Sequence, residues 1–208
     1  MSDWAALRWA RTGTGAGLAK SGGLLAELRI RHAEAHRAYH TFTHLEEAFG
    51  LLDSQPLPFP VEVELALWYH DAIYDPTATD NERQSAALAV AHLGALGVEA
   101  ARLDRIATLI EATAHHVAPS GDQDAALLLD VDLGILGAAP DRFDTYDAQI
   151  RREYAFVPED VYRQARAAIL AGMLHRPRLF VTEALHGRLD AQARLNLARA
   201  IERLDHGV

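Results

Sequence analysis

The sequence predicts an all-α protein, a bundle of helices. Apolar residues recur at spacings of three and four along nearly the whole chain. No stretch alternates with a period of two for long enough to form a sheet. The chain has 208 residues, half of them hydrophobic, which is enough for a buried core. No linker or repeat divides it, so we expect a single domain over residues 1–208.

Turn-forming residues set the expected helix boundaries. The prolines within 56–60 form a rigid connector, Pro76 stops a helix, and Pro158 fits a first helical turn. The Gly-rich segment 12–23 is expected to be a flexible connection, because it lacks the Gly before Lys that a phosphate loop needs. We expect helices at residues 3–10, 24–38, 43–53, 61–73, 80–96, 99–117, 122–137, 140–154, 158–174 and 190–205.

Composition excludes several classes of function. The chain has no Cys, so disulfides and thiolate zinc sites are excluded and any metal must be held by His and carboxylates. The net charge of −9 and the dispersed Arg residues argue against a nucleic-acid polymer as partner. We find no basic start followed by an apolar run and no apolar stretch of membrane-spanning length, and therefore expect a cytoplasmic protein without a membrane partner.

Polar pairs stand out in otherwise apolar segments. His70 and Asp71 lie side by side in WYHDAIYD, where burial is costly unless the pair is hydrogen-bonded or binds a metal. His40 and His44 in YHTFTH would share one helix face if one helix includes both. Thr41 stands where a zinc peptidase has its catalytic Glu, so a peptidase is not expected.

A third polar pair, Asp130 and Asp132, lies in the apolar run ALLLDVDLGILG. Two carboxylates there would repel each other in a low dielectric, which favours a ligand role for one of them. The alternative is that both face solvent on an amphipathic helix. Because they are two residues apart, they lie on nearly opposite helix faces, and only one is expected to point inward.

The order His, His-Asp, Asp resembles the HD superfamily of metal-dependent phosphohydrolases, and specifically a bacterial family of predicted HD phosphohydrolases of about this length. The resemblance covers most of the chain in seven ordered stretches. They are RAYHTFTHLEEAF (37–49), LALWYHDAIYDP (65–76), DNERQSA (80–86), IEATAHH (110–116), LLDVDLGILG (128–137), IRREYAFVPEDVYRQAR (150–166) and ARLNLA (193–198).

The resemblance implies an HD-type helical bundle, with a metal-binding core at about 37–140 and C-terminal helices at about 141–205 packed on it. It implies His44, His70, Asp71 and Asp132 as ligands of one divalent ion, which could be Mn, Fe, Co, Zn, Ni or Mg. Asp130 would then be a partner of the site or a helix cap.

The resemblance also draws attention to Asp75. In alarmone hydrolases of the superfamily an acidic pair stands here and handles the attacking water. This chain has Tyr74-Asp75 instead, which puts an alarmone substrate in doubt. Asp75 is a candidate general base, and the alternative is that it caps the turn before Pro76.

Six further residues are candidates for catalysis or substrate binding, and each also has a purely structural interpretation. Glu82 and His116 are candidate catalytic residues, and His40, His115, Arg151 and Arg166 are candidate substrate-binding residues. A guanidinium can bind phosphate oxygens in a bidentate manner. The alternatives are helix capping near Glu82, an exposed helix end at His115 and His116, and solvated or Glu-paired arginines.

We therefore expect a metal-dependent phosphohydrolase that acts on a small phosphorylated, nucleotide-like metabolite through an activated water. The substrate itself is not readable from the sequence, and a homodimer is compatible with it. The alternatives are a non-catalytic HD scaffold that binds a nucleotide or a partner protein, and an alarmone hydrolase.

Overall fold

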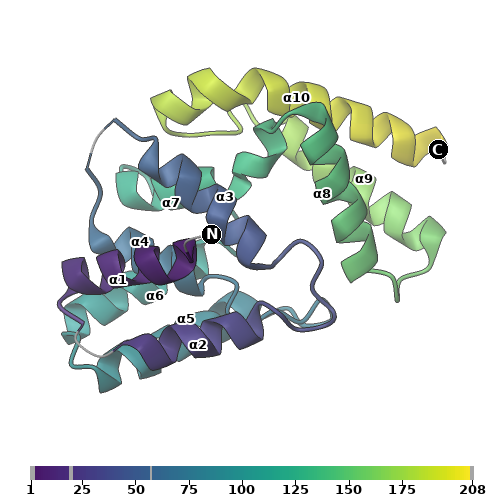
Figure 1. Ribbon diagram of the computed structural model, residues 1–208. Coiled ribbons are helices and arrows are strands. Elements are labelled where there is room, and N and C mark those ends of the chain that lie inside the picture. Colours follow the sequence, from purple (N-terminus) through teal and green to yellow (C-terminus); the bar gives the residue numbers. More distant parts are fainter. Residues whose placement is uncertain (1–2, 19–20, 57, 207–208) are drawn as a thin grey trace. The chain divides into compact units, whose positions relative to one another are not determined.

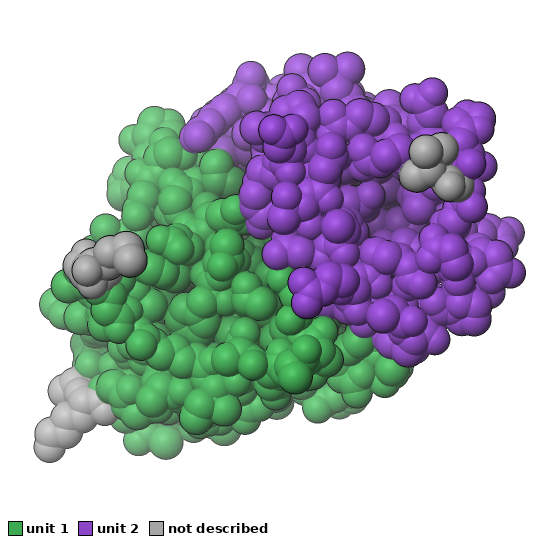
Figure 2. All heavy atoms as spheres, turned by 45° about the vertical axis from the view of Figure 1, so that its right-hand side comes forward, with its two compact units in different colours: residues 1–129 green, residues 130–208 purple. Residues whose placement is uncertain are grey.

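The computed structural model describes residues 3–18, 21–56 and 58–206, and within these ranges every regular element is a helix (Figure 1). The all-α prediction is therefore confirmed. The chain forms two compact units, residues 1–129 and 130–208, which Figure 2 colours separately. The prediction of a single domain stays a prediction. No described helix combines the length and the apolar character needed to cross a lipid bilayer.

The first unit is built around one buried helix. Its helices are α1 (Trp4–Ala16), α2 (Gly22–Arg31), α3 (Phe42–Asp53), α4 (Val61–Tyr69), α5 (Asn81–Ala95), α6 (Ala100–Ala112) and the start of α7 (Gln123–Asp132). Helix α4 contacts α1, α3, α5 and α6, and its last five residues have no exposed surface. A helix that is apolar on every side is stable only when other helices surround it. The end of α4, which carries His70 and Asp71, is therefore firmly held.

A buried polar network joins three helices of this unit. Arg8 on α1 forms ion pairs with Asp53 on α3, at 2.6 Å, and with Glu64 on α4, at 3.1 Å. The Thr12 hydroxyl donates to the Glu64 carboxylate and accepts from Trp68 Nε1 at 3.3 Å. Because charges buried in this way need partners in fixed positions, the network fixes how α1 and α3 lie against α4.

The second unit contains the 3₁₀ helix η1 (Leu133–Gly137), α8 (Pro140–Glu153), α9 (Glu159–Leu174) and α10 (Glu183–His206). Helix α10 contacts η1, α8 and α9. Gly137 permits its close approach to η1, because a Cβ added there would lie 2.6 Å from Cβ of Leu189. Asn196 strengthens the contact by donating from Nδ2 to the carbonyls of Leu136 and Ala138, each at 2.9 Å.

Several helix ends differ from the sequence predictions. Helix α1 continues to Ala16 through residues expected to be flexible, because Thr12 is buried against Glu64 and Gly17 ends the helix with φ +73°. Lys20 lies outside the described residues. Helix α2 ends at Arg31 rather than residue 38, and α10 begins at Glu183 rather than residue 190. The predicted helix 122–137 changes at Leu133 from α7 into η1.

Candidate metal centre

His70 lies at the carboxyl end of α4, as its C-cap residue. Its side chain is buried, and its Nδ1 lies 2.9 Å from the Leu67 carbonyl oxygen. Because a carbonyl can only accept, Nδ1 carries the hydrogen and donates it. Nε2 therefore carries the lone pair, as a metal ligand requires.

His44 approaches from the first turn of α3. The helix begins at Phe42, with Thr41 as its N-cap residue, and His44 is buried. The Tyr39 hydroxyl lies 2.9 Å from His44 Nδ1, and the two rings are 4.8 Å apart. The contact leaves Nε2 as the ring atom that faces His70, at a distance of 3.1 Å between the two Nε2 atoms.

The Asp71 carboxylate completes a group of three donors within the first unit. Its Oδ2 lies 3.0 Å from His70 Nε2 and 3.6 Å from His44 Nε2. Ligands of a tetrahedral zinc ion, with bonds of about 2.05 Å, lie roughly 3.3 Å from one another. The three spacings of 3.0, 3.1 and 3.6 Å are thus those of atoms that share one small cation, and the residues present fit a metal ion.

The charge state of Asp71 also suits a ligand. Burial opposes its ionisation, but the imidazoles of His70, His40 and His44, when they carry a proton, outweigh burial and hold the pKa of Asp71 below its ordinary value; a cation bound by neutral imidazoles would act in the same direction. The side chain is only 17% exposed. Asp71 is therefore an ionised, largely buried carboxylate, which needs a cation or a hydrogen-bond donor beside it.

Of the two acids on α7, Asp130 has a structural partner. It is buried and accepts from the backbone N–H groups of Val181, at 2.8 Å, and Thr182, at 2.7 Å, just before α10 begins. It therefore caps α10, one of the two roles expected for it. Asp132, the last residue of α7, is half-buried, and its role as a metal ligand stays a prediction.

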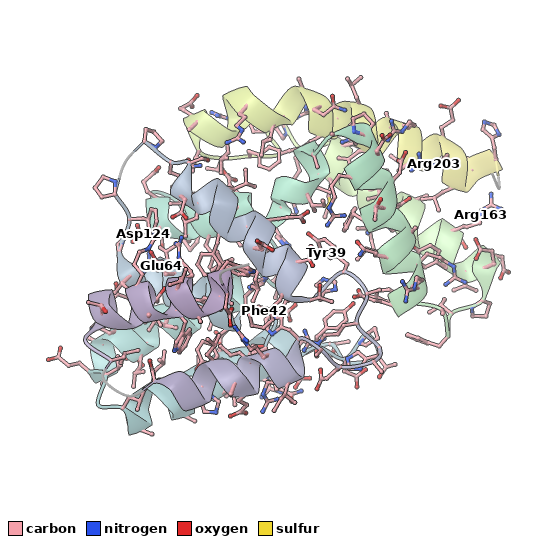
Figure 3. The ribbon with its side chains drawn as sticks, viewed as in Figure 1. Tyr39, Phe42, Glu64, Asp124, Arg163 and Arg203 are labelled. Atoms are coloured by element: carbon pink, nitrogen blue, oxygen red, sulfur yellow. The ribbon has the colours of Figure 1, made fainter. Side chains whose placement is uncertain are left out.

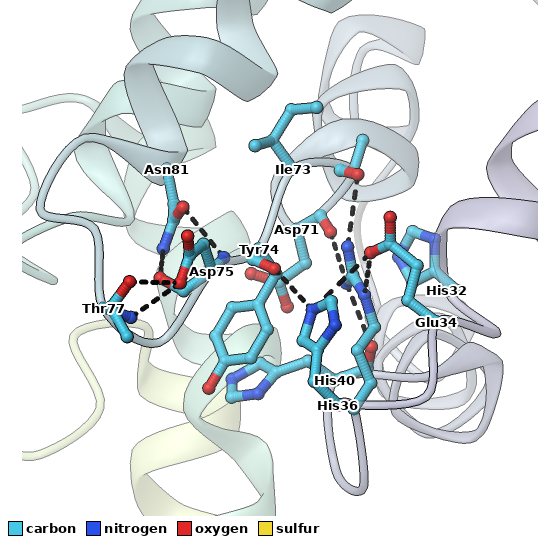
Figure 4. A network of polar contacts seen from close by, with 12 residues as sticks. His32, Glu34, His36, His40, Asp71, Ile73, Tyr74, Asp75, Thr77 and Asn81 are labelled. Atoms are coloured by element: carbon cyan, nitrogen blue, oxygen red, sulfur yellow. Dashed lines mark hydrogen bonds and ion pairs between the residues drawn. The ribbon is translucent and has the colours of Figure 1, made fainter. Parts of the chain in front are cut away.

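Arg37 holds the backbone of the site by hydrogen bonds to its carbonyl groups. The sequence interpretation gave Arg37 no role. Its side chain is completely buried. Nη1 donates to the carbonyls of Asp71, at 2.7 Å, and His40, at 3.1 Å, and Nη2 donates to Ala72 at 3.2 Å (Figure 4). Since one guanidinium binds both segments, Arg37 fixes the distance between them. The sequence signal that could have indicated a role for Arg37 is its position as the first residue of the stretch RAYHTFTHLEEAF, which carries the resemblance.

Tyr39 is the second residue that the sequence interpretation missed, and we expect Tyr39→Phe to weaken metal binding about tenfold. For His44 Nε2 to bind an ion, Nδ1 must carry the hydrogen and donate it to the Tyr39 oxygen. Phenylalanine removes this acceptor and keeps the ring. Competition with a chromophoric chelator measures the affinity, and Tyr74→Phe is the matched control. Equal affinities of the Tyr39 variant and the wild type would contradict this role.

His40 does not share a helix with His44, because α3 begins after it. Its half-buried ring stacks on Tyr74, with centroids 4.1 Å apart, and lies 6.2 Å from the ring of His44 (Figure 4). His36 stacks on Tyr74 as well, at 6.2 Å, and its Nε2 donates to the Tyr74 carbonyl. His40 therefore lies beside the three donors, and its expected contact with substrate stays a prediction.

Asp75 lies in a turn that follows the end of α4 at Tyr69, four residues after Asp71. Its exposed carboxylate accepts from the N–H of Thr77, at 2.8 Å, and from the Thr77 hydroxyl, at 2.7 Å. These hydrogen bonds lower the pKa of Asp75. Asn81 bonds both backbone groups of Asp75. The contacts favour a capping role over that of a general base.

We expect two substitutions of Asp75 to separate these roles. Asp75→Asn keeps the acceptor and should change neither stability nor rate appreciably, whereas Asp75→Ala should cost about 1 kcal/mol of stability with the rate nearly intact. Urea unfolding and initial rates measure the two effects. If Asp75 is a base instead, both variants will fold normally and lose roughly two to four orders of magnitude in rate.

Glu82 lies half-buried in the first turn of α5. The neighbouring Asp80 makes no side-chain capping bond to the helix backbone and pairs with Arg83 instead. Ser85, one turn further, accepts from the N–H of Ile73 at 2.9 Å and so ties α5 to the loop after His70-Asp71. The catalytic role of Glu82 stays a prediction.

His115 and His116 follow the end of α6 at Ala112, and are not part of the predicted helix 99–117. His115 is exposed and His116 half-buried. His116 has φ +49°, the left-handed conformation that commonly terminates a helix. The structure thus gives them a helix-end position, and their predicted roles stay open.

Arg151 and Arg166 lie in the second unit, and each has polar partners there. Arg151 pairs with Glu159 at 2.8 Å and donates to two backbone carbonyls. Arg166 is buried and donates to the Tyr146 hydroxyl at 3.0 Å and to Asp147 at 3.4 Å. Their predicted contact with substrate stays a prediction.

Comparison with known proteins adds no family to this description: no family model, no curated protein and no solved structure matches the chain.

Proposed function

We propose that this protein is a metal-dependent phosphohydrolase of the HD type, acting on a small phosphorylated, nucleotide-like metabolite. The observation that carries the proposal is the convergence of His44, His70 and Asp71 at 3.0 to 3.6 Å. Both histidines present Nε2, and the carboxylate is ionised. Two imidazoles and a carboxylate are a donor set for a transition metal rather than for calcium.

We assign Asp132 as the fourth ligand. It is the second acid of the LDVDL stretch, and the first, Asp130, is engaged in capping α10. A divalent ion bound by these residues would supply Lewis-acid chemistry, polarising a phosphoryl oxygen and lowering the pKa of water near neutral pH. The chain's own contribution is to hold the donors at fixed distances, through the carbonyl contacts of Arg37 and the Leu67 and Tyr39 contacts of the two histidines.

Metal analysis combined with a substrate panel tests the proposal. The full chain is reconstituted separately with Mn, Fe, Co, Zn, Ni and Mg, and bound metal is counted after removal of free ions. We expect about one ion per chain and metal-dependent release of phosphate from at least one nucleotide or sugar phosphate. Failure to retain any ion would overturn the proposal. One retained ion without turnover of any compound would favour the non-catalytic scaffold.

The same panel tests substrate specificity. We expect guanosine tetraphosphate to be hydrolysed slowly or not at all compared with nucleoside monophosphates. Tyr74 stands where the alarmone hydrolases have an acid, and its ring is stacked on His40. Asp75, the remaining acid, is bonded within its own turn. Turnover of the tetraphosphate as fast as that of the best monophosphate would instead favour an alarmone hydrolase.

A further inference from the structure

A cavity of about 480 Å³ lies among α8, α9 and α10, and its lining residues all belong to the second unit. It falls within the size range of small-molecule sites. Its lining combines charged side chains with a small apolar surface. The lining residues are Asp144, Asp147, Ala148, Arg151, Glu159, Tyr162, Arg163, Arg203 and Leu204.

The lining itself holds three carboxylates and three arginines, and two arginines that do not line the cavity, Arg166 and Arg199, pair with the same carboxylates, so this ion-pair network carries more positive than negative charge. Asp144 pairs with Arg199, at 2.7 Å, and with Arg203, at 2.9 Å. Asp147 is shared by Arg166 and Arg203, at 3.4 Å each, and Glu159 pairs with Arg151. Four arginines thus share three carboxylates. Arg163 adds a fifth positive charge and has no carboxylate partner among the residues that the structure describes.

Arg163 is an arginine of the lining that has a hydrogen-bond donor unused by the described residues. On α9, its Nε and Nη2 both donate to the Leu204 carbonyl in the last turn of α10, with the Nε contact at 2.6 Å. Nη1 makes no hydrogen bond to a described residue. Arg163 on α9 and Arg203 on α10 lie on two of the three helices that line the cavity (Figure 3). A guanidinium held in this way lines the cavity with a donor still available.

Tyr162 supplies the second kind of contact. Its ring is buried and lies under the Arg151 guanidinium, 4.5 Å from ring centroid to Cζ. Burial raises the pKa of Tyr162 to about 12, so the hydroxyl keeps its proton and can donate it. With Ala148 and Leu204, the ring forms the apolar part of the lining.

We infer that this cavity binds a phosphate group, either inorganic phosphate or the phosphate of a small organic ester, with Arg163 as its principal contact. A dianion neutralises the excess charge, and the planar guanidinium matches its oxygens. The competing explanation is that Arg163 only caps α10, since a basic side chain at a helix carboxyl end is favourable by itself. The inference does not depend on the metal-dependent activity proposed above.

Calorimetric titration of the full chain with inorganic phosphate tests the inference. The titration is run at pH 8 and constant ionic strength, with EDTA present so that a metal ion does not contribute. We expect saturable binding of about one phosphate per chain, weakened about tenfold or more in Arg163→Gln. Arg83→Gln, which removes an exposed arginine of α5, is the control for net charge and should bind like the wild type.

Phenyl phosphate distinguishes the two sources of the phosphate group. Tighter binding than that of inorganic phosphate, lost in Arg163→Gln, would identify an organic ester, and equal binding would identify free phosphate. If circular dichroism shows that Arg163→Gln does not fold, Arg163→Lys replaces it. Lysine keeps the charge and one contact to Leu204, and binding should weaken several-fold. Absence of saturable binding, or equal affinity in the wild type and the folded variant, would overturn the inference.

Discussion

Replacement of Asp71 by Ala is expected to reduce bound metal from about one ion per chain to almost none, and to lower phosphate release by roughly three orders of magnitude or more. Asp71 is the only carboxylate among the three donors of the first unit. Its loss leaves His44, His70 and the proposed ligand Asp132, and a set with one carboxylate fewer binds a divalent ion far more weakly. Metal content after gel filtration and initial rates with the best substrate measure the two effects.

Two controls make this experiment specific. Asp75→Ala removes a carboxylate four residues away that bonds only within its own turn, and should keep the metal. Asp71→Glu keeps the charge but moves it by about one methylene, so it should retain some metal with a reduced rate. Full metal content and full activity in Asp71→Ala would show that the ion, or the reaction, uses other residues.

The sequence predicted helices well where local signals mark their ends. Helices α3, α5, α8 and α9 begin and end within one or two residues of expectation, since Thr41, Pro140 and Pro158 mark starts. The misplaced ends depend on contacts distant in sequence. The start of α10 is set by Asp130, and the length of α1 by the burial of Thr12 against Glu64.

The candidate site shows the same division. His44, His70 and Asp71 were recognised by residue type and order, and the structure brings them together. Spacing left open whether His40 shares a helix with His44, and the structure shows that it does not; the predicted helix 61–73 was too long, because α4 ends at Tyr69. Nothing in the apolar run before His70 marks an end to α4. The segment after that end is stabilised by the guanidinium of Arg37, which binds the Asp71 carbonyl from 34 residues earlier in the chain. No local sequence pattern reveals such a contact.

Acid should destabilise this protein through His32, a third buried histidine of the first unit. The ring is only 2% exposed, its Nδ1 donates to the Leu28 carbonyl at 3.0 Å, and its buried Nε2 has no hydrogen-bond partner among the described residues. Burial, reinforced by the positive charge of Arg37, lowers the pKa of His32 from 6.5 to about 3. The folded chain therefore keeps this ring neutral at pH values where the unfolded chain protonates it.

The sign follows from proton uptake. Between pH 6.5 and about 3 the unfolded state binds a proton at His32 that the folded state does not, so stability falls as the pH falls through this window. At pH 5, about 1.5 units below the ordinary value, the loss should be about 2 kcal/mol. Above pH 7 the group should contribute no pH dependence.

We expect His32→Phe to lose about 2 kcal/mol less stability than the wild type between pH 7.5 and 5.0, as measured by urea unfolding in EDTA. Phenylalanine fills a similar volume, and the Leu28 carbonyl keeps the backbone N–H of residue 32 as its donor. His175→Phe is the matched control, because His175 makes the same bond to the carbonyl four residues earlier but is exposed. Equal acid sensitivity in the wild type and both variants would show that His32 protonates in the folded state without cost, and that its burial does not set the acid limit of the fold.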